Sequence, residues 1–582
     1  MERQATLPIT LTQRPATLIE QAEWLRIHRA EDTAVVMVTH EGETRITYGQ
    51  FFARAEAYAA VLLEAGIRPG DLVALILQHG ESVLYGFWGA LLMGAVPSIF
   101  PFLSDKLDPA RYFDSARQLI DHSGVKAVIT YRELEADLRH HLQGVEAVLM
   151  TTEALTQSTR TVGARHASPL QNHLFLNIQS DDTAFLQHSS GSTGLQKGVM
   201  LTHRALLNQV ASYSAAIRLA PDDVVVSWLP LYHDMGLIAG FLMPILQGVK
   251  LVLMSPFQWV RDPKMLLWAL HHHRGTLCWL PNFAYNFLAT RVRDADLDGL
   301  DLSAVRALVN CSEPVYAESH AAFLARYAPY GFRESALTVC YAMAENTFAV
   351  TQAGIDAPLK LDVIDRRALM DERRAVPAAG DAPSMTLVSN GRPIPNCDVR
   401  VVDEARQPLP QRHVGEIALR SDSMLAGYYR RPDATAAVLA DGWYFTGDMG
   451  YLADGELYIT GRKKDLIIVG GKNVYPQDIE NLLNNISGLH PGRATAFGVL
   501  NPKLGTEDVA IVAELEADVL EDVQARAAVQ REIRARVAQN TDVTARYVQL
   551  VPPKWLIKTS SGKVARAANR DKFLCEVLGQ TD

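Results

Sequence analysis

Short apolar runs alternate with longer amphipathic stretches through the first half of the chain. The runs read LVALIL, KAVIT, VVVSWL, KLVLM and GTLCWL, and they occupy residues 72–77, 126–130, 224–229, 250–254 and 275–280. Apolar runs of this length are typical of strands that are buried on both faces, as in parallel sheets covered by helices. The pattern therefore predicts βα units built on buried, mostly parallel sheets.

The pattern changes after about Asn390. Apolar and polar residues then alternate in CDVRVVD, GEIALRS and GWYFTGDMGYLADGELYITGR, with turn residues such as Asp454 and Gly455 between the segments. From Asp465 onward a strand (LIIV), a helix (PQDIENLLNN), two strands (ATAFGVL and DVAIVAEL) and a long helix at about 522–538 are expected. The chain is thus predicted to continue into a small β-rich unit and then into a separate small α+β domain.

Two segments break this rhythm. Residues 82–103 are apolar over a length that raises the question of a membrane span, but glycines and prolines interrupt them, so they are predicted to form a buried helix that runs into a strand. Residues 351–386 are polar, charged and rich in proline and alanine, with one short helix-like piece around 366–373. A long irregular connection inside a compact domain is either functional or disordered.

The composition is that of an ordinary globular protein. Of 582 residues, 48% are hydrophobic and 21% are charged, and the net charge of -9 gives no reason to expect nucleic acid as a partner. The five cysteines are widely spaced and contain no C-x-x-C pair, which fits neither a disulfide framework nor a thiolate zinc site. A polar N-terminus argues against an export signal, so we expect a cytoplasmic protein without stable membrane insertion.

The most informative stretch is SSGSTGLQKG, residues 189–198. Its glycines expose successive backbone N–H groups, its hydroxyls add donors and Lys197 adds a positive charge, which together suit an anion. It is not a Walker A loop, because that motif requires Ser or Thr after the lysine and Gly198 stands there. A flexible Gly/Ser loop is the alternative on this segment alone.

Further motifs follow in order along the chain. They are SWLPLYHDMG, YAMAENT, GEIALRS, YFTGDMG, GRKKDLIIVGGKNVYPQDIE and KTSSGK. Together with SSGSTGLQKG this set resembles the adenylate-forming superfamily of acyl-CoA synthetases, peptide-synthetase adenylation domains and luciferases. The resemblance extends from about Thr47 to Arg570.

The resemblance implies a fold and a set of domains. The fold is α/β, with a large N-terminal adenylate-forming domain of two βα sheet subdomains and a small β-barrel-like subdomain, followed by a small mobile α+β C-terminal domain. The expected boundaries are 1–460 for the adenylation domain, with the β-rich subdomain at about 388–460 and a family-specific insertion at about 351–386. A hinge at 461–465 then leads to the C-terminal domain at 466–582.

The resemblance also implies the chemistry. The enzymes join a carboxylate to the α-phosphorus of ATP, so the site must hold ATP, Mg²⁺ and an acid in line. Asp448 resembles the carboxylate that accepts both ribose hydroxyls, and Glu345 resembles the Mg²⁺ ligand, with Thr193 as a further metal or phosphate contact. The implied nucleotide-binding residues are Ser189, Ser190, Gly191, Ser192, Thr193, Gly194, Lys197, Ser312, Glu313, Tyr341, Ala342, Met343, Ala344, Asp448 and Arg462.

The resemblance implies roles for three further basic residues, two near the reacting atoms and one at the hinge. Lys563 resembles the C-terminal lysine that stabilises charge on the acyl carboxylate and the α-phosphate. His233 resembles a histidine near the acyl pocket, although a packing histidine is an alternative. Lys464 occupies the position about which the C-terminal domain rotates in the family. Trp279 and Phe283 are candidates for the acyl pocket or for ordinary core.

The second half-reaction is the more difficult choice. Fatty acyl-AMP ligases pass the acyl group to the phosphopantetheine arm of an acyl carrier protein, and they carry an extra segment that the stretch at 351–386 resembles. The wording LPLYHDMGLI, the sequence Glu313-Pro314-Val315, RAVPA and YPQDIE favour this group. We therefore expect a fatty acyl-AMP ligase that activates a fatty acid and loads a separate carrier protein. The alternatives are a medium- or long-chain acyl-CoA synthetase, a non-catalytic relative and a luciferase-type oxidase.

Several positions depart from the family pattern. Gln196 replaces a usual proline, Ala342 replaces a usual glycine, and Cys311-Ser312 stands where smaller residues are common near the adenine. Added bulk where backbone approaches nucleotide predicts a slightly altered affinity or pose for ATP. The sequence GGKN is closer to the CoA ligases and weakens the choice of acceptor.

Overall fold

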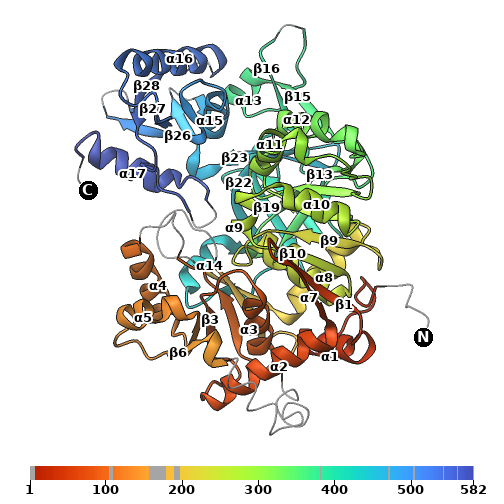
Figure 1. The fold of residues 1–582 in the computed structure, drawn as a ribbon. Helices are drawn as coiled ribbons and strands as arrows, with labels where there is room; N and C mark the ends of the chain where they lie inside the picture. Colours follow the sequence, from red (N-terminus) through yellow and green to blue (C-terminus); the bar gives the residue numbers. More distant parts are fainter. Residues whose placement is uncertain are drawn as a thin grey trace.

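The computed structural model describes residues 7–103, 109–155, 178–188, 197–380, 382–469, 472–502, 505–541, 543–559 and 562–580. Figure 1 shows a large N-terminal body in which helices pack on both sides of central sheets, and a smaller C-terminal unit at one end of it. The same view shows the helix α13 and the strands β15 and β16 reaching toward that C-terminal unit.

A nine-stranded sheet forms the centre of the N-terminal body, in the order β17-β14-β13-β12-β11-β9-β10-β1-β2. The middle strands pair in parallel, and antiparallel strands close both edges. The bounds are β1 Thr33–Thr39, β2 Gly42–Thr47, β9 Val224–Ser227, β10 Lys250–Met254, β11 Leu277–Leu280, β12 Ala307–Asn310, β13 Leu337–Ala342, β14 Ala349–Gln352 and β17 Arg392–Pro393.

The helices of this part follow the strands in the order that the βα pattern predicts. His203–Ala216 (α7) begins at Thr202, whose side chain accepts a hydrogen bond from the backbone N–H of Ala205, as an N-cap does. The others are α1 Leu18–His28, α2 Tyr48–Glu64, α8 Met243–Gln247, α9 Pro256–Arg261, α10 Lys264–His272, α11 Asn282–Arg291 and α12 Ala317–Tyr327, together with a π-helix, η3, at Met235–Leu242.

A second, four-stranded parallel sheet has the order β4-β3-β5-β6. Its strands are β3 Leu72–Leu75, β4 Val96–Ile99, β5 Ala127–Thr130 and β6 Val148–Thr151, and its helices are α3 Glu81–Leu92, α4 Pro109–Ser123 and α5 Arg132–His141. The predicted parallel sheets are confirmed, because all five apolar runs are strands in one of these two sheets.

The apolar run at 82–103 is a helix followed by a strand, as predicted. The helix α3 leads into β4, and every residue of α3 from Val83 to Leu92 is buried. The helix requires a glycine at position 89, because a Cβ on Gly89 would lie 2.7 Å from the Cβ of Tyr58 and 2.8 Å from the carbonyl oxygen of Ala55 on α2. Over the described ranges, no helix combines the length and the apolarity that a membrane crossing requires.

The β-rich unit is a five-stranded antiparallel sheet. Strands β18 Cys397–Val402, β19 Gly415–Ser421, β22 Trp443–Ala453 and β21 Leu439–Ala440 lie in that order, and β23 Glu456–Arg462 pairs with β22. A smaller sheet joins β20 Gly427–Tyr428 to β8 Gly198–Thr202 and β7 Thr183–His188, and α14 spans Pro432–Val438.

The segment at 351–386 is more regular than its composition indicates. Its first two residues complete β14, and its later part contains an antiparallel pair of strands, β15 Leu361–Asp365 and β16 Ser384–Val388, while residues 353–360 form neither helix nor strand. The helix-like piece is confirmed as α13, Arg366–Glu372, which Asp365 caps through hydrogen bonds from the N–H groups of Arg367 and Ala368. The prediction of an irregular segment is therefore wrong. The sequence pattern does not indicate β15, because its exposed positions carry Leu361 and Val363 while the polar Asp362 is buried.

The C-terminal unit has the α+β composition that was predicted. Its sheet has the order β26-β27-β28, with β26 at Leu489–Asn501, β27 at Thr506–Leu515 and β28 at Ala545–Val551. The remaining elements are a small hairpin of β24 Ile467–Val469 and β25 Lys472–Val474, and the helices α15 Pro476–Leu483, α16 Val523–Thr541 and α17 Arg566–Glu576. Its main apolar cluster also includes Met370 of α13, so the hairpin segment packs on this unit. The expected α/β fold class is confirmed.

Candidate nucleotide and acyl site

Six of the predicted nucleotide residues lie at or just after the carboxyl ends of two neighbouring parallel strands, namely Ser312, Glu313 and the four from Tyr341 to Ala344. Cys311, Ser312 and Glu313 follow the end of β12, and β13, its neighbour in parallel register, ends at Ala342. Ligands of α/β sheets bind at this edge of the strands. Ser312 has φ 71°, in the left-handed region, and its hydroxyl points to the sulfur atoms of Cys311 and Met235, at 3.7 and 3.8 Å.

Glu313 has a structural partner at this edge. Its Oε2 accepts a hydrogen bond of 3.0 Å from the backbone N–H of Phe283, in the first turn of α11. A carboxylate is favoured there because the N–H groups of a first helical turn lack intrahelical partners and carry partial positive charge. The predicted role of Glu313 in nucleotide binding would have to come from its other oxygen or its backbone.

A strained turn presents Glu345 at the end of β13. The turn is a 3₁₀ segment, Ala344–Asn346, and the N–H of Met343 closes it by donating to the carbonyl oxygen of Phe348 at 2.8 Å. Thr347 is fully buried with φ 62°, which is unfavourable for a β-branched residue. Its hydroxyl donates to the carbonyl oxygen of Ser423 at 2.7 Å and holds it there. Strain of this kind is common at functional sites.

The carboxylate of Glu345 has one ordered contact. Its Oε1 accepts a hydrogen bond of 2.8 Å from the hydroxyl of Tyr428, while no donor reaches Oε2 from the part of the chain that the structure describes. The backbone is fixed as well, since the N–H of Leu425 donates to the carbonyl oxygen of Glu345 at 2.8 Å. One oxygen is thus oriented by protein and the other is open to a ligand.

Asp448 lies between a tyrosine and an arginine. Its Oδ2 accepts a hydrogen bond of 2.6 Å from the hydroxyl of Tyr341, and its Oδ1 lies 3.1 Å from the Nε of Arg462, its cross-strand neighbour on β23. Burial and the Asp448 carboxylate raise the pKa of Tyr341, so its hydroxyl stays a donor. The Asp448 charge likewise raises the pKa of Arg462. Three of the predicted nucleotide residues therefore form one connected group.

Lys563 reaches this edge from the C-terminal unit. Its ammonium group donates a hydrogen bond to the backbone carbonyl of Ser312. The charge is felt nearby, because burial and the Lys563 ammonium lower the pKa of His233 to about 3, which keeps the imidazole neutral. Burial raises the pKa of the neighbouring Asp234, while a hydrogen bond from the Met235 N–H and the charge of Lys563 oppose that rise. His233, Asp234 and Lys563 therefore share one electrostatic environment.

Lys197 is the first residue of the predicted phosphate loop that the structure describes. Its ammonium lies 4.7 Å from the ring centroid of Tyr428, a cation–π arrangement. The predicted phosphate contacts Ser189, Ser190, Gly191, Ser192, Thr193 and Gly194, and with them the metal contact assigned to Thr193, lie outside the described residues.

The predicted hinge lies in a short 3₁₀ turn, Lys463–Asp465, that joins β23 to the C-terminal unit. Burial, and then the charge of Arg462, lower the pKa of Lys464. Its neighbours are paired on opposite sides of the turn. Lys463 lies 2.9 Å from Glu416 of β19, and Asp465 lies 2.5 Å from Arg566 of α17. The turn is thus connected by ion pairs to both units.

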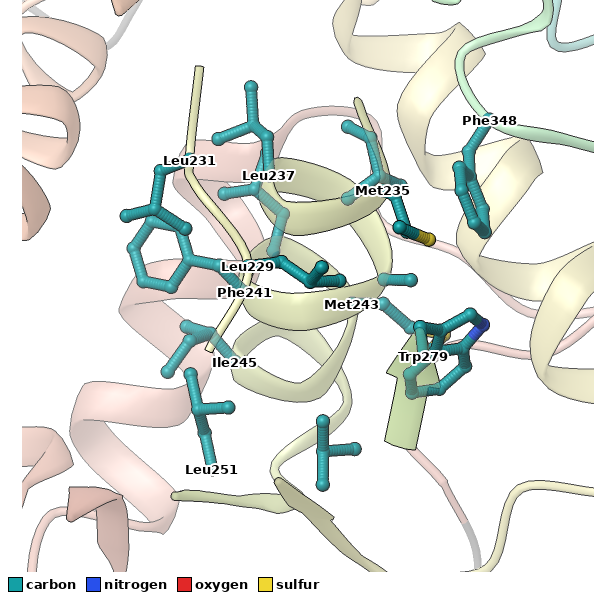
Figure 2. Close-up of a cluster of buried hydrophobic side chains, with 14 of the residues drawn as sticks. Leu229, Leu231, Met235, Leu237, Phe241, Met243, Ile245, Leu251, Trp279 and Phe348 are labelled. Atoms are coloured by element: carbon teal, nitrogen blue, oxygen red, sulfur yellow. The ribbon is translucent and has the colours of Figure 1, made fainter. Parts of the chain in front are cut away.

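Trp279 and Phe283 lie in different surroundings. Trp279 is fully buried in the central core, where Figure 2 shows it beside Met243 and Phe348, and its indole N–H donates to the hydroxyl of Tyr213 at 2.8 Å. Phe283 is 43% exposed and lies edge-on to the stacked rings of Trp228 and Trp259. Phe283 thus has the surface access that a pocket residue needs, and Trp279 packs as core does.

Sequence reasoning missed three side chains at this site. They are Tyr428, Tyr444 and Asp234. The hydroxyl oxygens of Tyr428 and Tyr444 lie 3.2 Å apart, and the Tyr428 hydroxyl donates to Glu345. Asp234 directly follows His233 and is influenced by the charge of Lys563. Asp234 and Tyr444 were inside recognised motifs, LYHDMG and YFTGDMG, so their position was a usable signal. Tyr428 stands in GYYRRP, and nothing in its spacing connects it to Glu345 or to Lys197.

Comparison with known proteins agrees with this geometry. The family model described as AMP-binding enzyme matches residues 23–429, and the model of the AMP-binding enzyme C-terminal domain matches residues 471–570. The chain therefore belongs to the AMP-binding enzyme family.

Individual relatives narrow the resemblance. The long-chain-fatty-acid–AMP ligase FadD26 of Mycobacterium marinum is 30% identical over 617 residues, which covers 99% of this chain and 100% of that protein. A Caulobacter vibrioides protein provisionally named an acyl-CoA synthetase is also 30% identical, over 94% of each chain. A solved structure from a study of fatty acyl-adenylate ligases of E. coli and L. pneumophila superposes with a TM-score of 0.86 at 29% identity, covering 96% of this chain and 97% of that one. The resemblance to fatty acyl-AMP ligases is confirmed.

Proposed function

We propose that this protein activates a fatty acid with Mg-ATP to a fatty acyl adenylate, and then passes the acyl group to the phosphopantetheine thiol of a separate acyl carrier protein. The observation that carries the proposal is the meeting of Glu345, the Asp448 group and Lys563 at one edge of the central sheet. The relative FadD26, which is named a long-chain-fatty-acid–AMP ligase and is matched over its whole length, supports the fatty acid as substrate.

The first half-reaction follows from the charges of these residues. A carboxylate oxygen of the fatty acid attacks the α-phosphorus, the bond to the oxygen that bridges to the β-phosphate breaks, and pyrophosphate leaves. Lys563 provides a fixed positive charge where the negative charges of carboxylate and α-phosphate approach each other. The neutral imidazole of His233 adds no competing charge beside it. The main work of the site is thus positioning and electrostatic stabilisation.

Asp448 is suited to hold the ribose. A carboxylate has enough lone pairs to accept from two adjacent hydroxyls while it keeps the contacts from Tyr341 and Arg462. Those two donors fix the plane of the carboxylate before the nucleotide arrives. The nucleotide would therefore bind to an acceptor that needs no rearrangement.

The donor set at Glu345 fits a magnesium ion. Mg²⁺ prefers hard oxygen ligands and binds through one or two carboxylates together with substrate phosphates, and Glu345 offers its Oε2, to which no described residue donates. Glu345 would hold the ion, which would supply positive charge that neutralises the triphosphate. The chain itself contributes the orientation of the carboxylate and the two lysines, Lys197 and Lys563, around the triphosphate.

In the second half-reaction the carrier thiol sulfur attacks the acyl carbonyl carbon, AMP leaves with the electron pair of the broken bond, and the thiol proton is released. For this step the acceptor must reach the adenylate, and we propose a rotation of the C-terminal unit about Lys464.

The cysteines that the structure describes are all free thiols, which suits a reducing cytoplasm.

An acyl-CoA synthetase is the second candidate function, because the Caulobacter relative carries that provisional name at the same identity. Both candidates share the first half-reaction. The direct test of that shared step is acid-dependent exchange of labelled pyrophosphate into ATP, with acids from hexanoic to stearic. Exchange with at least one of these acids is expected, and its absence with every one would contradict both enzyme functions.

A further inference from the structure

Tyr428 contacts two predicted site residues that come from distant parts of the chain. Its hydroxyl donates to the Oε1 of Glu345 at 2.8 Å, and its ring lies 4.7 Å from the ammonium of Lys197. Tyr428 is 4% exposed and Lys197 is half-buried, so both interactions are partly shielded from water. Charge-assisted hydrogen bonds and cation–π contacts are both stronger when desolvated.

The backbone around Tyr428 allows little freedom. Strand β20 pairs with β8 in the register Tyr428↔Val199, and the N–H of Tyr429 donates to the carbonyl oxygen of Gly198 at 2.7 Å. The N–H of Tyr428 itself donates to the hydroxyl of Thr435 at 2.9 Å. Tyr428 therefore lies on a strand that pairs with β8, the strand directly after Lys197, and this pairing sets the direction of its ring.

The hydroxyl has a defined donor direction. Its phenol proton is given to Oε1 of Glu345, because an ionised carboxylate can only accept. Because that proton is given to Glu345, the hydroxyl of Tyr444, at 3.2 Å, must donate to the oxygen of Tyr428. The result is a directed chain from Tyr444 through Tyr428 to Oε1, which leaves Oε2 of Glu345 as the open oxygen.

We propose that Tyr428 is a positioning residue that couples the metal-binding carboxylate to the lysine at the end of the phosphate loop. Its hydroxyl sets the rotation of the Glu345 carboxylate, and its ring face holds the Lys197 ammonium on the same side of the site. The inference rests on the proposed function, since it assigns Glu345 to Mg²⁺ and Lys197 to the phosphates. It predicts that one side chain controls both contacts with the Mg-triphosphate.

Binding calorimetry with α,β-methylene-ATP, with and without Mg²⁺, tests this without turnover. Tyr428→Phe removes the hydroxyl and keeps the ring, so the gain in affinity that Mg²⁺ provides is expected to fall about tenfold while metal-free binding stays the same. Tyr428→Leu also removes the ring, so in this variant metal-free binding is expected to weaken as well, by a factor of about three. Tyr429→Phe is the matched control, because in the described structure the Tyr429 hydroxyl has no hydrogen-bond partner, and it is expected to change neither quantity.

A double-mutant cycle separates positioning from general loosening of the fold. If Tyr428 acts through Glu345, the double variant Tyr428→Phe/Glu345→Gln should lose no more Mg²⁺-dependent affinity than Glu345→Gln alone. An unchanged Mg²⁺-dependent gain in Tyr428→Phe would overturn the proposal, and so would additive losses in the double variant. A failure of the proposed function is a different result, in which the wild-type protein binds Mg-nucleotide normally but exchanges no pyrophosphate with any acid.

Discussion

The ammonium group of Lys563 donates a hydrogen bond to the backbone carbonyl of Ser312, across a sequence separation of 251 residues. Ser312 lies at the carboxyl edge of the central sheet, so this contact brings a lysine of the C-terminal unit to the ends of the strands that would hold the nucleotide. Burial lowers the pKa of His233, and the charge of Lys563 lowers it further. At Asp234 burial raises the pKa, and the charge of Lys563 opposes that rise. In this arrangement of the two units, the lysine lies at the strand ends where the proposed function would place adenylate formation.

Replacing that charge should therefore affect the first half-reaction directly. Lys563→Ala is expected to lower the rate of acid-dependent pyrophosphate exchange by about two to three orders of magnitude, as the loss of one pre-organised donor does. Lys554→Ala, in an exposed loop of the same unit, should leave the rate unchanged. Nearly wild-type exchange by Lys563→Ala would remove Lys563 from the mechanism.

Asp448 offers a test of nucleotide binding. Asp448→Asn keeps the shape of the side chain but turns one acceptor oxygen into a donor, which would face the hydroxyl of Tyr341 or the guanidinium of Arg462. We expect the KM for ATP to rise about tenfold or more, since a buried mismatch costs about 1–3 kcal/mol. The comparison variant is Asp454→Asn, in the exposed turn that follows β22. Equal KM values for both variants and the wild type would show that Asp448 does not contact the ribose.

Much of the fold was accessible from the sequence, because buried parallel strands and their helices have periodic apolar patterns. The five apolar runs, the helix α3 with its following strand, and the α+β unit at the C-terminus were predicted on that basis. The hairpin of β15 and β16 was not, since Leu361 and Val363 are exposed and its polar residues resemble a loop. Local apolar patterns indicate which residues are buried, and they give no signal where the apolar residues are exposed.

The site was predictable only where motifs carried the information. Asp448, Glu345 and Lys563 were identified from recognised segments, whereas the contacts of Tyr428 depend on the pairing of β20 with β8, which joins segments far apart in the chain. For Trp279 the sequence left two possibilities open, the acyl pocket and ordinary core. It stands beside apolar pocket candidates in the sequence, yet its ring is enclosed in the core and bonded to Tyr213 (Figure 2).

Buried neutral histidines predict a loss of stability in acid. Burial lowers the pKa values of His188, His203 and His320 to about 4, from the ordinary value of about 6.5. Between pH 6.5 and 4 the unfolded chain therefore binds more protons than the folded chain, and the free energy of unfolding falls as the pH decreases. Each of these groups can cost roughly 3 kcal/mol at the low end of this window.

The measurement is the thermal midpoint as a function of pH. His203→Asn preserves an acceptor for the N–H of Leu18 and removes one titrating ring, so the midpoint should fall less steeply below pH 6.5 than in the wild type. His140→Asn, at an exposed position, should leave the slope as it is. An identical slope in His203→Asn and the wild type would contradict this account of its burial.

Deleting the segment of β15, α13 and β16 tests its role in acceptor choice, and the deletion also removes Asp362, which accepts hydrogen bonds from Arg412 and Tyr451. The ends of this segment are adjacent, because the N–H of Ser389 donates to the carbonyl oxygen of Lys360 at 2.9 Å, so a short glycine linker can replace the residues from Leu361 to Val388. The deletion keeps β14 and β17 in the central sheet. It removes α13, whose Met370 packs in the C-terminal unit and accepts a hydrogen bond of 3.0 Å from the Asn473 side chain.

Without these contacts the C-terminal unit should turn more freely, and the deletion variant is expected to form acyl-CoA when CoA is supplied. The single variant Met370→Asp, which weakens the same contact without shortening the chain, should shift the product in the same direction. A folded deletion variant that still exchanges pyrophosphate but forms no acyl-CoA would mean that this segment is not the barrier to CoA.

The central claim is the choice of acceptor, and product analysis by mass spectrometry tests it most directly. Enzyme, Mg-ATP and a ladder of fatty acids are incubated with CoA in one reaction and with a phosphopantetheinylated carrier protein in another. We predict acyl adenylate in both reactions, acylated carrier protein in the second, and little acyl-CoA in the first. Abundant acyl-CoA, with the carrier protein left unmodified, would contradict the proposal and assign this chain to the acyl-CoA synthetases.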